Sequence, residues 1–142
     1  MSLLSLTIAL SLAATPAIAA AGDLSPLQWE KRIVVIFGSA ADPLVAEQRR
    51  RLDGETASLE ERDLVVVHVD AHAVTTIFGE PGPLDAAALR QRLDQAEDIG
   101  FSVVLVGKDG TVKLREAAPV DTAALFALID SMPMRQSEMG ER

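Results

Sequence analysis

Short apolar segments alternate with longer polar ones along the chain and predict the strands of one sheet. They are rich in Val, Ile and Leu, and they lie at residues 33–37, 64–69, 103–106 and 111–114. The first two contain almost no polar residue, a pattern typical of strands that are buried on both faces. Lys108-Asp109-Gly110 favours a tight hairpin between the last two, because such a turn needs the positive φ that Asp-Gly supplies. Residues 74–78 are a candidate for one further short strand.

Three helices are predicted between and after these strands. Each begins at an aspartate whose carboxylate can accept the free N–H groups of the first turn. They run from Asp42 towards Leu59, from Asp85 to Gly100 and from Asp121 to Pro133. Gly54 is expected to interrupt the first helix, and Gly100 to form the C-cap of the second. Pro133 is expected to end the third helix and to leave residues 134–139 as a tail.

The order strand, helix, strand, helix, strand, strand, helix narrows the range of folds. A strand–helix–strand unit has a right-handed crossover and places its strands in parallel, whereas the C-terminal hairpin adds an antiparallel pair. The result is a mixed four-stranded sheet flanked by helices, which is the architecture of the thioredoxin core. With 142 residues, the chain suits one domain of this thioredoxin-like α/β class.

The N-terminal segment has the pattern of an export signal. Residues 3–14 are apolar, and Ala17-Ile18-Ala19 fits the small–x–small pattern of a cleavage site. The apolar run is shorter than the roughly 20 residues that a membrane-spanning helix needs. We therefore expect residues 1–21 to be a cleaved signal peptide, residues 22–142 to form one mature domain, and the protein to be periplasmic or secreted. Because no Lys or Arg precedes the run, a membrane anchor and a buried N-terminal helix remain alternatives.

Composition excludes several kinds of chemistry. The chain contains no cysteine, which rules out disulfides, thiolate nucleophiles and thiolate metal ligands. Its net charge of −8 disfavours a phosphate backbone and an anionic membrane surface, so we expect no nucleic-acid partner and no membrane partner after signal cleavage. Neighbouring carboxylates offset the basic run Arg49-Arg50-Arg51, which is expected to be a solvated helix face, with an anion- or partner-binding patch as the alternative.

The positions that carry thiol chemistry in thioredoxins hold other residues in this sequence. The segment after the first strand, where thioredoxins have Cys-x-x-Cys, is Gly38-Ser39-Ala40-Ala41-Asp42. The segment before the third strand, where redox members of the fold have a proline, is Gly100-Phe101-Ser102. Ser39 is expected to be a structural turn residue, because serine becomes nucleophilic only beside a base. No catalytic residue is assigned, and whether the protein is an enzyme stays open.

Four segments of the chain resemble one known family. They are Gln28-Trp29-Glu30-Lys31-Arg32, Glu61-Arg62-Asp63-Leu64, Val106-Gly107-Lys108-Asp109-Gly110 and Ile129-Asp130-Ser131-Met132-Pro133-Met134-Arg135-Gln136. Together they are similar to the P-DUDES domain, a family of unknown function found in small exported bacterial proteins and in secreted sushi-repeat proteins. The resemblance covers about residues 24–139. It implies a thioredoxin-like fold and brings no established activity with it.

Two further sets of side chains have a metal-binding alternative to a structural role. His68, Asp70 and His72 can share a metal ion only if the chain turns after Asp70, and otherwise they are a strand-end histidine and a solvated loop. The soft sulfur ligands that Cu(I) prefers occur near the C-terminus, at Met132, Met134 and Met139. Methionines at a helix end more often fill gaps in a core. We assign no metal and no cofactor to either set.

Residues in or beside the family-like segments are the candidate binding residues. They are Arg62, Lys108, Asp109, Arg115, Met134, Arg135 and Glu138. If the C-terminal segment folds back on the hairpin, Arg135 and Glu138 can pair with Asp109 or Lys108. Such pairs form either a structural clasp or a surface that binds a protein partner or a small ligand.

A non-catalytic binding or interaction module is the function that this sequence leads us to expect. The predicted scaffold is complete, whereas the residues of a thioredoxin redox centre are missing. An enzyme that uses non-thiol chemistry on the same fold and a periplasmic metal-binding protein are the alternatives.

Overall fold

The computed structural model describes residues 24–96 and 100–141, and the predicted signal peptide at 1–21 lies outside the described residues. The strands are β1 (Arg32–Phe37), β2 (Leu64–Val69), β3 (Val74–Phe78), β4 (Ser102–Val106) and β5 (Val112–Glu116). The helices are α1 (Pro43–Leu52), α2 (Thr56–Glu61), α3 (Ala86–Arg92), α4 (Thr122–Asp130) and α5 (Pro133–Gly140). No helix in the described part of the chain has the length and apolar character needed to cross a membrane.

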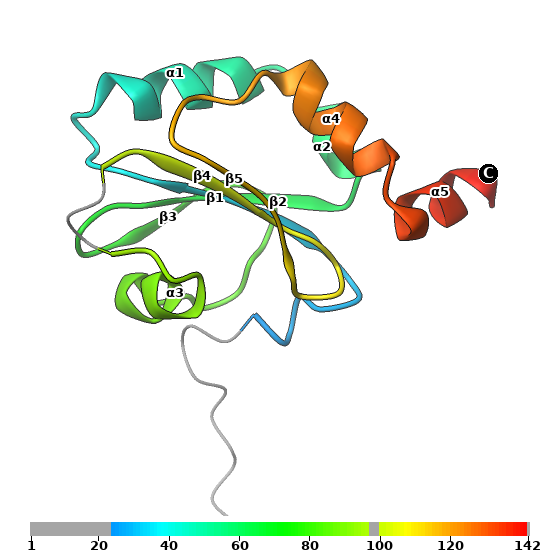
Figure 1. Ribbon diagram of the computed structural model, residues 1–142, viewed down its shortest axis with the longest axis horizontal. Coiled ribbons are helices and arrows are strands. Elements are labelled where there is room, and N and C mark those ends of the chain that lie inside the picture. Colours follow the sequence, from blue (N-terminus) through cyan, green and yellow to red (C-terminus); the bar gives the residue numbers. More distant parts are fainter. Residues whose placement is uncertain (1–23, 97–99, 142) are drawn as a thin grey trace, which may run out of the picture.

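The strands form one mixed sheet in the order β3-β2-β1-β4-β5 (Figure 1). β1 runs parallel to β2 and antiparallel to β4, while β3 and β5 pair antiparallel with their neighbours. The predicted mixed α/β class is confirmed. The predicted number of four strands is wrong by one, because residues 74–78 pair with β2 as an edge strand. The residues of β3 are partly buried or exposed, so its sequence carries a weaker apolar pattern than the central strands.

The two faces of the sheet carry separate hydrophobic cores. Figure 1 shows α3 on one face and α1, α2 and α4 on the other. Successive residues of a strand point to opposite faces. Ile33, Val35 and Phe37 of β1 therefore join the core with α3, whereas Val34 and Ile36 join the core with the other helices. Every residue of β1 and β2 is buried, as expected for strands covered on both faces.

The predicted helix starts are confirmed. Each capping carboxylate accepts a hydrogen bond from a backbone N–H in the first turn: Asp42 from Leu44, Asp85 from Ala88 and Asp121 from Ala124. The predicted interruption of the first helix is also present, because α1 ends at Leu52 and α2 begins at Thr56, on either side of Gly54. These signals are local, so the sequence alone was sufficient to find them.

The end of α3 and the segment after Pro133 differ from the prediction. Gly100 is not the C-cap of a helix, because α3 already ends at Arg92 and Asp94 adopts the left-handed conformation after it, with a φ of 53°. Pro133 follows the end of α4 as predicted, but it also begins α5, which replaces the expected tail. Proline suits both roles, because it cannot continue a helix from within and its fixed φ fits the first helical position.

Gly38 lies where β1 turns towards α1, and its backbone leaves no room for a side chain. Its φ is 150°, and a Cβ at this position would lie 2.8 Å from Cγ2 of Val45 in α1. We predict that Gly38→Ala lowers the free energy of unfolding by about 1–3 kcal/mol, as measured by urea denaturation. Gly100→Ala is the matched control, because a Cβ there would meet nothing within 4 Å. Equal losses of stability in the two variants would contradict the strain at Gly38.

Candidate functional site

A cluster of paired charges lies where β1 begins and where α5 folds back against the sheet. Its central members, Arg32 and Arg135, are each only 1% exposed. Arg32 donates two hydrogen bonds of 3.2 Å to the carboxylate of Glu138 and one of 2.9 Å to the backbone carbonyl of Arg62. Because Arg32 belongs to β1 and Glu138 to α5, this ion pair connects the first strand to the last helix.

Arg135 connects α5 to α2 and to the end of α4. Its guanidinium donates to the carboxylate of Asp130 at 3.0 Å and to the side-chain and backbone oxygens of Glu61 at 3.1 Å each. Arg62 donates to the same Asp130 carboxylate at 3.0 and 2.8 Å, and its guanidinium carbon lies 4.3 Å from the centre of the Phe126 ring. One carboxylate therefore serves two arginines from different segments.

Lys108 adds the β4–β5 hairpin to this cluster. Its ammonium group donates to the carboxylate of Asp63 at 2.8 Å and to that of Glu138, and the residue is 8% exposed. We call the eight paired residues the C-terminal clasp; they are Arg32, Glu61, Arg62, Asp63, Lys108, Asp130, Arg135 and Glu138. The clasp contains four cations and four carboxylates, so the charges that it withdraws from water are balanced.

The carboxylates of the clasp are held in their charged form. Burial raises the pKa of Glu138, but the hydrogen bonds and charges of Lys108 and Arg32 outweigh this effect, and the pKa lies below the usual 4.5. Burial likewise opposes the arginine contacts of Asp130, whose pKa nevertheless lies below the usual 3.8. A carboxylate with a lowered pKa stabilises the fold above its unfolded-state pKa. This contribution is lost as the pH falls through the folded-state pKa.

Four of the predicted binding residues belong to the C-terminal clasp, namely Arg62, Lys108, Arg135 and Glu138. The expected pair of Glu138 with Lys108 is present. The expected pairing of Arg135 with the hairpin is wrong, because Asp130 and Glu61 occupy its guanidinium. The C-terminal segment thus folds back on the sheet, but Arg135 faces the helices instead of the hairpin.

Two other predicted residues make contacts outside the clasp. Asp109 accepts hydrogen bonds from the side chain of Lys113 and from the hairpin backbone, and these lower its pKa to about 2. Arg115 donates to Oε1 of Gln95 at 3.0 Å and to the carbonyl of Leu93, so it ties β5 to the segment after α3. The structure therefore does not bring Arg115 together with the other predicted residues.

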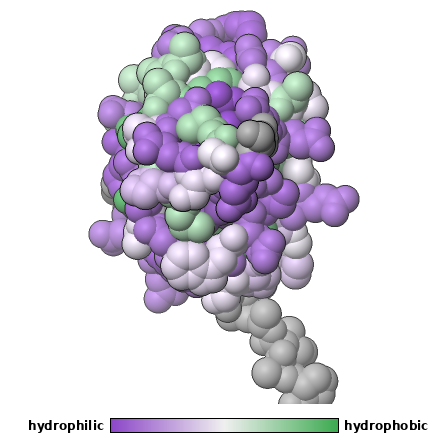
Figure 2. All heavy atoms as spheres, turned by 90° about the vertical axis from the view of Figure 1, so that its right-hand side faces the viewer, coloured by the Kyte–Doolittle hydropathy of each residue, from purple (hydrophilic) through white to green (hydrophobic). Residues whose placement is uncertain are grey.

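A hollow of about 360 Å³ opens beside the clasp, between the β4–β5 hairpin and the junction of α4 and α5. Its lining includes Trp29, Lys108, Asp109, Lys113, Pro133 and Met134. We call it the Trp29 pocket. Figure 2 faces the right-hand side of Figure 1, where α5 lies, and shows apolar residues as small patches in a largely hydrophilic surface. Three predicted binding residues line the pocket, including Met134, which is 37% exposed.

Trp29 is presented to solvent by a strained backbone. Its side chain is 61% exposed and its φ is 69°, a left-handed conformation that bulky residues rarely adopt. The N–H of Trp29 donates to the carbonyl of Lys108 at 2.6 Å, and the side-chain amide of Gln28 donates to the carbonyl of Asp109 at 3.1 Å. These bonds fix the segment to the hairpin. Strained backbone positions cluster at functional sites, and tryptophan is enriched among the residues that contribute most of the binding energy at interfaces.

Sequence reasoning did not single out two important residues of this region, Arg32 and Trp29. Arg32 stands directly before an apolar strand, which is a signal that such a charge is drawn into the buried sheet. Trp29 lies in a family-like segment and is the one tryptophan of the chain, which is the signal for a potential contact residue. Neither signal identifies the partner of Arg32 or of Trp29, because these partners lie far away in the sequence.

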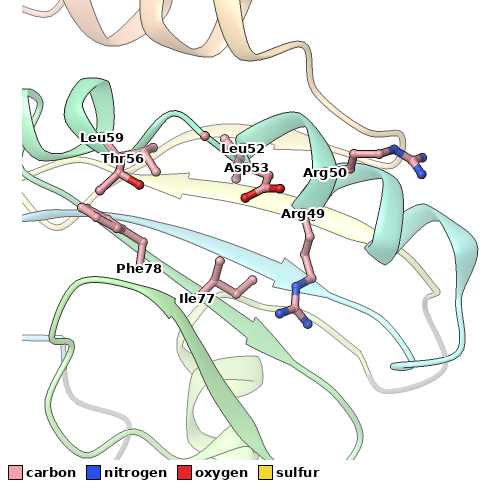
Figure 3. A pocket seen from close by; sticks show the side chains of 9 residues that line it. Arg49, Arg50, Leu52, Asp53, Thr56, Leu59, Ile77 and Phe78 are labelled. Atoms are coloured by element: carbon pink, nitrogen blue, oxygen red, sulfur yellow. The ribbon is translucent and has the colours of Figure 1, made fainter.

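A second hollow, of about 420 Å³, lies between α1, α2 and β3 (Figure 3). Arg49 extends over it towards β3, whereas Arg50 turns away. Arg50 and Arg51 both form ion pairs with Glu47, so two of the three arginines of the basic run are paired along their own helix. Phe78 lines this hollow but packs against the core. The hollow therefore offers no strongly exposed aromatic side chain to a ligand.

The turn from β1 to α1 has the contacts of a structural turn. Oγ of Ser39 accepts a hydrogen bond from the N–H of Ala41 at 3.3 Å. His68 is buried, and its Nε2 lies 2.8 Å from the carbonyl oxygen of Gly38. The chain does turn after Asp70, yet the described residues contain no group of three or more His, Asp or Glu side chains placed to hold a metal ion.

Glu138 carries the charge that balances both Arg32 and Lys108. We predict that Glu138→Gln lowers the free energy of unfolding at neutral pH by about 3 kcal/mol, because it leaves a buried guanidinium without its partner charge. Glu141→Gln is the control, since Glu141 is exposed and belongs to no ion pair among the described residues. Urea denaturation measures both variants, and a loss below about 0.5 kcal/mol for each would contradict the importance of the clasp.

The same variants test the pH dependence of the clasp. Since the pKa of Glu138 is lowered, its contribution is complete above pH 4.5 and is lost as the pH falls below that value. The wild-type protein and Glu141→Gln should therefore lose stability on acidification, and Glu138→Gln should lose less. Unfolding curves measured between neutral and acidic pH provide the comparison. Parallel profiles for all three proteins would show that Glu138 does not contribute in this way.

Solved structures of peroxiredoxins share the architecture of this protein. Thioredoxin peroxidase I of Plasmodium yoelii matches with a TM-score of 0.57 and 15% identity, over 80% of this chain and 79% of that one. The reduced 2-Cys peroxiredoxin of Plasmodium vivax gives 0.58 and 13%, over 80% and 84%. The mitochondrial 2-Cys peroxiredoxin of Plasmodium falciparum gives 0.57 and 12%, over 84% of each chain. At these identities the likeness concerns the fold alone, and the predicted thioredoxin-like fold is confirmed.

A match to a family model covers most of the chain. The model of the domain of unknown function DUF4174 matches residues 23–138. The matched region contains every residue of the C-terminal clasp and the whole lining of the Trp29 pocket. This chain therefore belongs to the DUF4174 family, whose function is unknown.

Proposed function

We propose that this protein is a non-catalytic binding module that receives a protein partner or a small ligand in the Trp29 pocket. The observation that carries the proposal is the presentation of Trp29. A tryptophan that is 61% exposed and held at positive φ gains little for the fold of the free chain. A buried aromatic anchor is, by contrast, a typical source of binding energy. The pocket beside it provides the place where a ligand can contact the ring.

The chemistry of the pocket favours an apolar group with a polar or charged end. Met132, Pro133 and Met134 form an apolar wall, and methionine adapts readily to different ligand shapes. Lys113 and Asp109 lie at the opposite, hairpin side of the pocket and pair with each other at 2.8 Å. A ligand that covers the methionines and Trp29 therefore meets polar side chains at its edge, which is the usual arrangement of an interface.

The clasp supports this role by making the pocket rigid. Glu138 joins α5 both to Arg32 of β1 and to Lys108 of the hairpin, so the two walls of the pocket share one anchoring carboxylate. A preformed site loses less conformational entropy on binding than a mobile one. In this proposal the charged residues predicted from the sequence therefore act mainly as supports, and the ligand contacts Trp29 and Met134.

A non-catalytic role and an extracytoplasmic location complete the proposal. The support for the first is the absence of cysteine from the chain and the turn contacts of Ser39 where thioredoxins carry a reactive thiol. The support for the second is the signal-like sequence at residues 1–21. The resemblance to the P-DUDES domain is in accord with the second, because that family occurs in exported proteins. We infer that the partner or ligand is met in the periplasm or outside the cell.

Trp29 gives the pocket its own fluorescence signal, because the chain has one tryptophan and no tyrosine. We predict that the apolar probe anilinonaphthalene sulfonate binds the folded protein and receives excitation energy from Trp29. Met134→Ala should weaken this binding about fivefold, through the loss of about 1 kcal/mol of apolar contact. Met139→Ala is the matched control, because both methionines lie on α5 and both are 37% exposed. Equal weakening in both variants, or no energy transfer, would contradict a site at Trp29.

Binding of a natural partner is tested by placing a photo-crosslinking amino acid at position 134 in the exported protein. We predict that light produces a discrete adduct from position 134, because this position lines the pocket. The same amino acid at position 139 is the control on the same helix. Adducts of equal yield from both positions would indicate random encounters. Their absence from both would contradict a partner or ligand at this pocket.

A further inference from the structure

A third hollow, of about 460 Å³, lies at the opposite end of β1 from the Trp29 pocket. It is formed where the β1–α1 turn, the β2–β3 turn and α3 come together. The lining residues used below are Gly38, Asp42, Asp70, His72, Ala73 and Arg90. None of them belongs to the clasp or to the Trp29 pocket, so this hollow is independent of the function proposed above.

Arg90 of α3 is the unusual residue of this hollow. It is only 7% exposed, and its Nη2 donates to the backbone carbonyl of Asp70 at 3.0 Å. Its guanidinium carbon lies 5.3 Å from the centre of the Phe37 ring. The other two nitrogens, Nε and Nη1, are buried and have no hydrogen-bond partner among the described residues. No carboxylate of the described residues forms an ion pair with Arg90.

The rest of the protein shows how unusual this arrangement is. Three arginines are buried among the described residues, namely Arg32, Arg90 and Arg135. Arg32 and Arg135 each bind a carboxylate, and every nitrogen of their side chains that is buried has a partner. Buried donors are almost always satisfied in native proteins, and a buried cation normally has a counter-charge. Arg90 has neither among the described residues, and an anion bound in the hollow would supply both.

We propose that this hollow binds a small organic carboxylate and that Arg90 is the residue that recognises it. A guanidinium presents several N–H donors in one plane, which match the two oxygens of a carboxylate. The bound anion supplies the missing acceptors and the missing counter-charge at once.

The two acidic residues of the lining limit the ligand to a single negative charge. Asp42 accepts the N–H of Leu44 at 2.9 Å, and Asp70 accepts those of His72 and Ala73 at 2.8 Å each. These backbone bonds lower the pKa of Asp70 below 3.8, so its carboxylate stays charged and repels further negative charge. These carboxylates repel a dianion such as sulfate about twice as strongly as a monoanion. A monocarboxylate meets this repulsion least while still satisfying Arg90.

The test uses sodium acetate, the simplest small carboxylate, with sodium chloride and sodium sulfate at matched ionic strength. Side-chain N–H resonances of arginine report each guanidinium directly in nitrogen-labelled protein. We expect acetate to shift the Nε–H resonance of Arg90 in a saturable way, while those of Arg32 and Arg135 stay in place. Chloride and sulfate should leave the Arg90 resonance unchanged. An Arg90 resonance that ignores acetate, or that responds to sulfate at least as strongly, would overturn the proposal.

Two substitutions separate recognition by Arg90 from general salt effects. Arg90→Met removes the charge but keeps an apolar side chain beside Phe37, and we expect acetate affinity, followed by backbone resonances around Gly38, to fall at least tenfold. Arg92→Met is the control on the same helix, because Arg92 is exposed and bonds to the carbonyl of Gly110 at 2.8 Å. Unchanged acetate affinity in Arg90→Met would refute the assignment. If that variant does not fold, the wild-type Nε–H titration decides alone.

Discussion

The rest of this structure depends on one constraint, which is that two buried guanidinium groups must each pair with a carboxylate. Arg32 and Arg135 are almost completely withdrawn from water, and a charge in that position is tolerated only beside an opposite charge. Glu138 and Asp130 supply those charges from the C-terminal part of the chain. This requirement holds α5 against the sheet and brings Met134 towards the hairpin. The Trp29 pocket exists because α5 is held there.

The thioredoxin-like scaffold offers two hollows at the two ends of its central strand β1. At the start of β1, the clasp leaves no buried charge without a partner, and the neighbouring pocket has an apolar wall. At its end, beyond Phe37, the hollow contains Arg90, whose charge has no partner in the described chain. The rule that a buried charge needs a counter-charge therefore has opposite consequences at the two ends of β1. Balanced charges act as a support beside the Trp29 pocket, whereas the unbalanced charge of Arg90 is the part of the third hollow that a ligand completes.

The parts of this structure that could be predicted from the sequence are those set by neighbouring residues. The caps at Asp42, Asp85 and Asp121 and the buried strands follow from local spacing, and so they were predicted correctly. The ion pair of Arg32 with Glu138 joins residues 106 positions apart, and no local pattern contains that information. The exposure of Trp29 could not be predicted from the sequence for the same reason, because its left-handed backbone is held by Lys108 of the distant hairpin.

Native-state hydrogen exchange of α5 tests the role of the clasp most directly. The helix has only eight residues, and a helix of that length is unstable in water unless tertiary contacts hold it. If the buried ion pairs fix α5 to the sheet, the amide of Gln136, which donates to the carbonyl of Met132 at 2.9 Å, should exchange at least a hundredfold more slowly than in an unstructured peptide. Exchange at the rate of an unstructured peptide would show that α5 is not held, and the account of the clasp would be wrong.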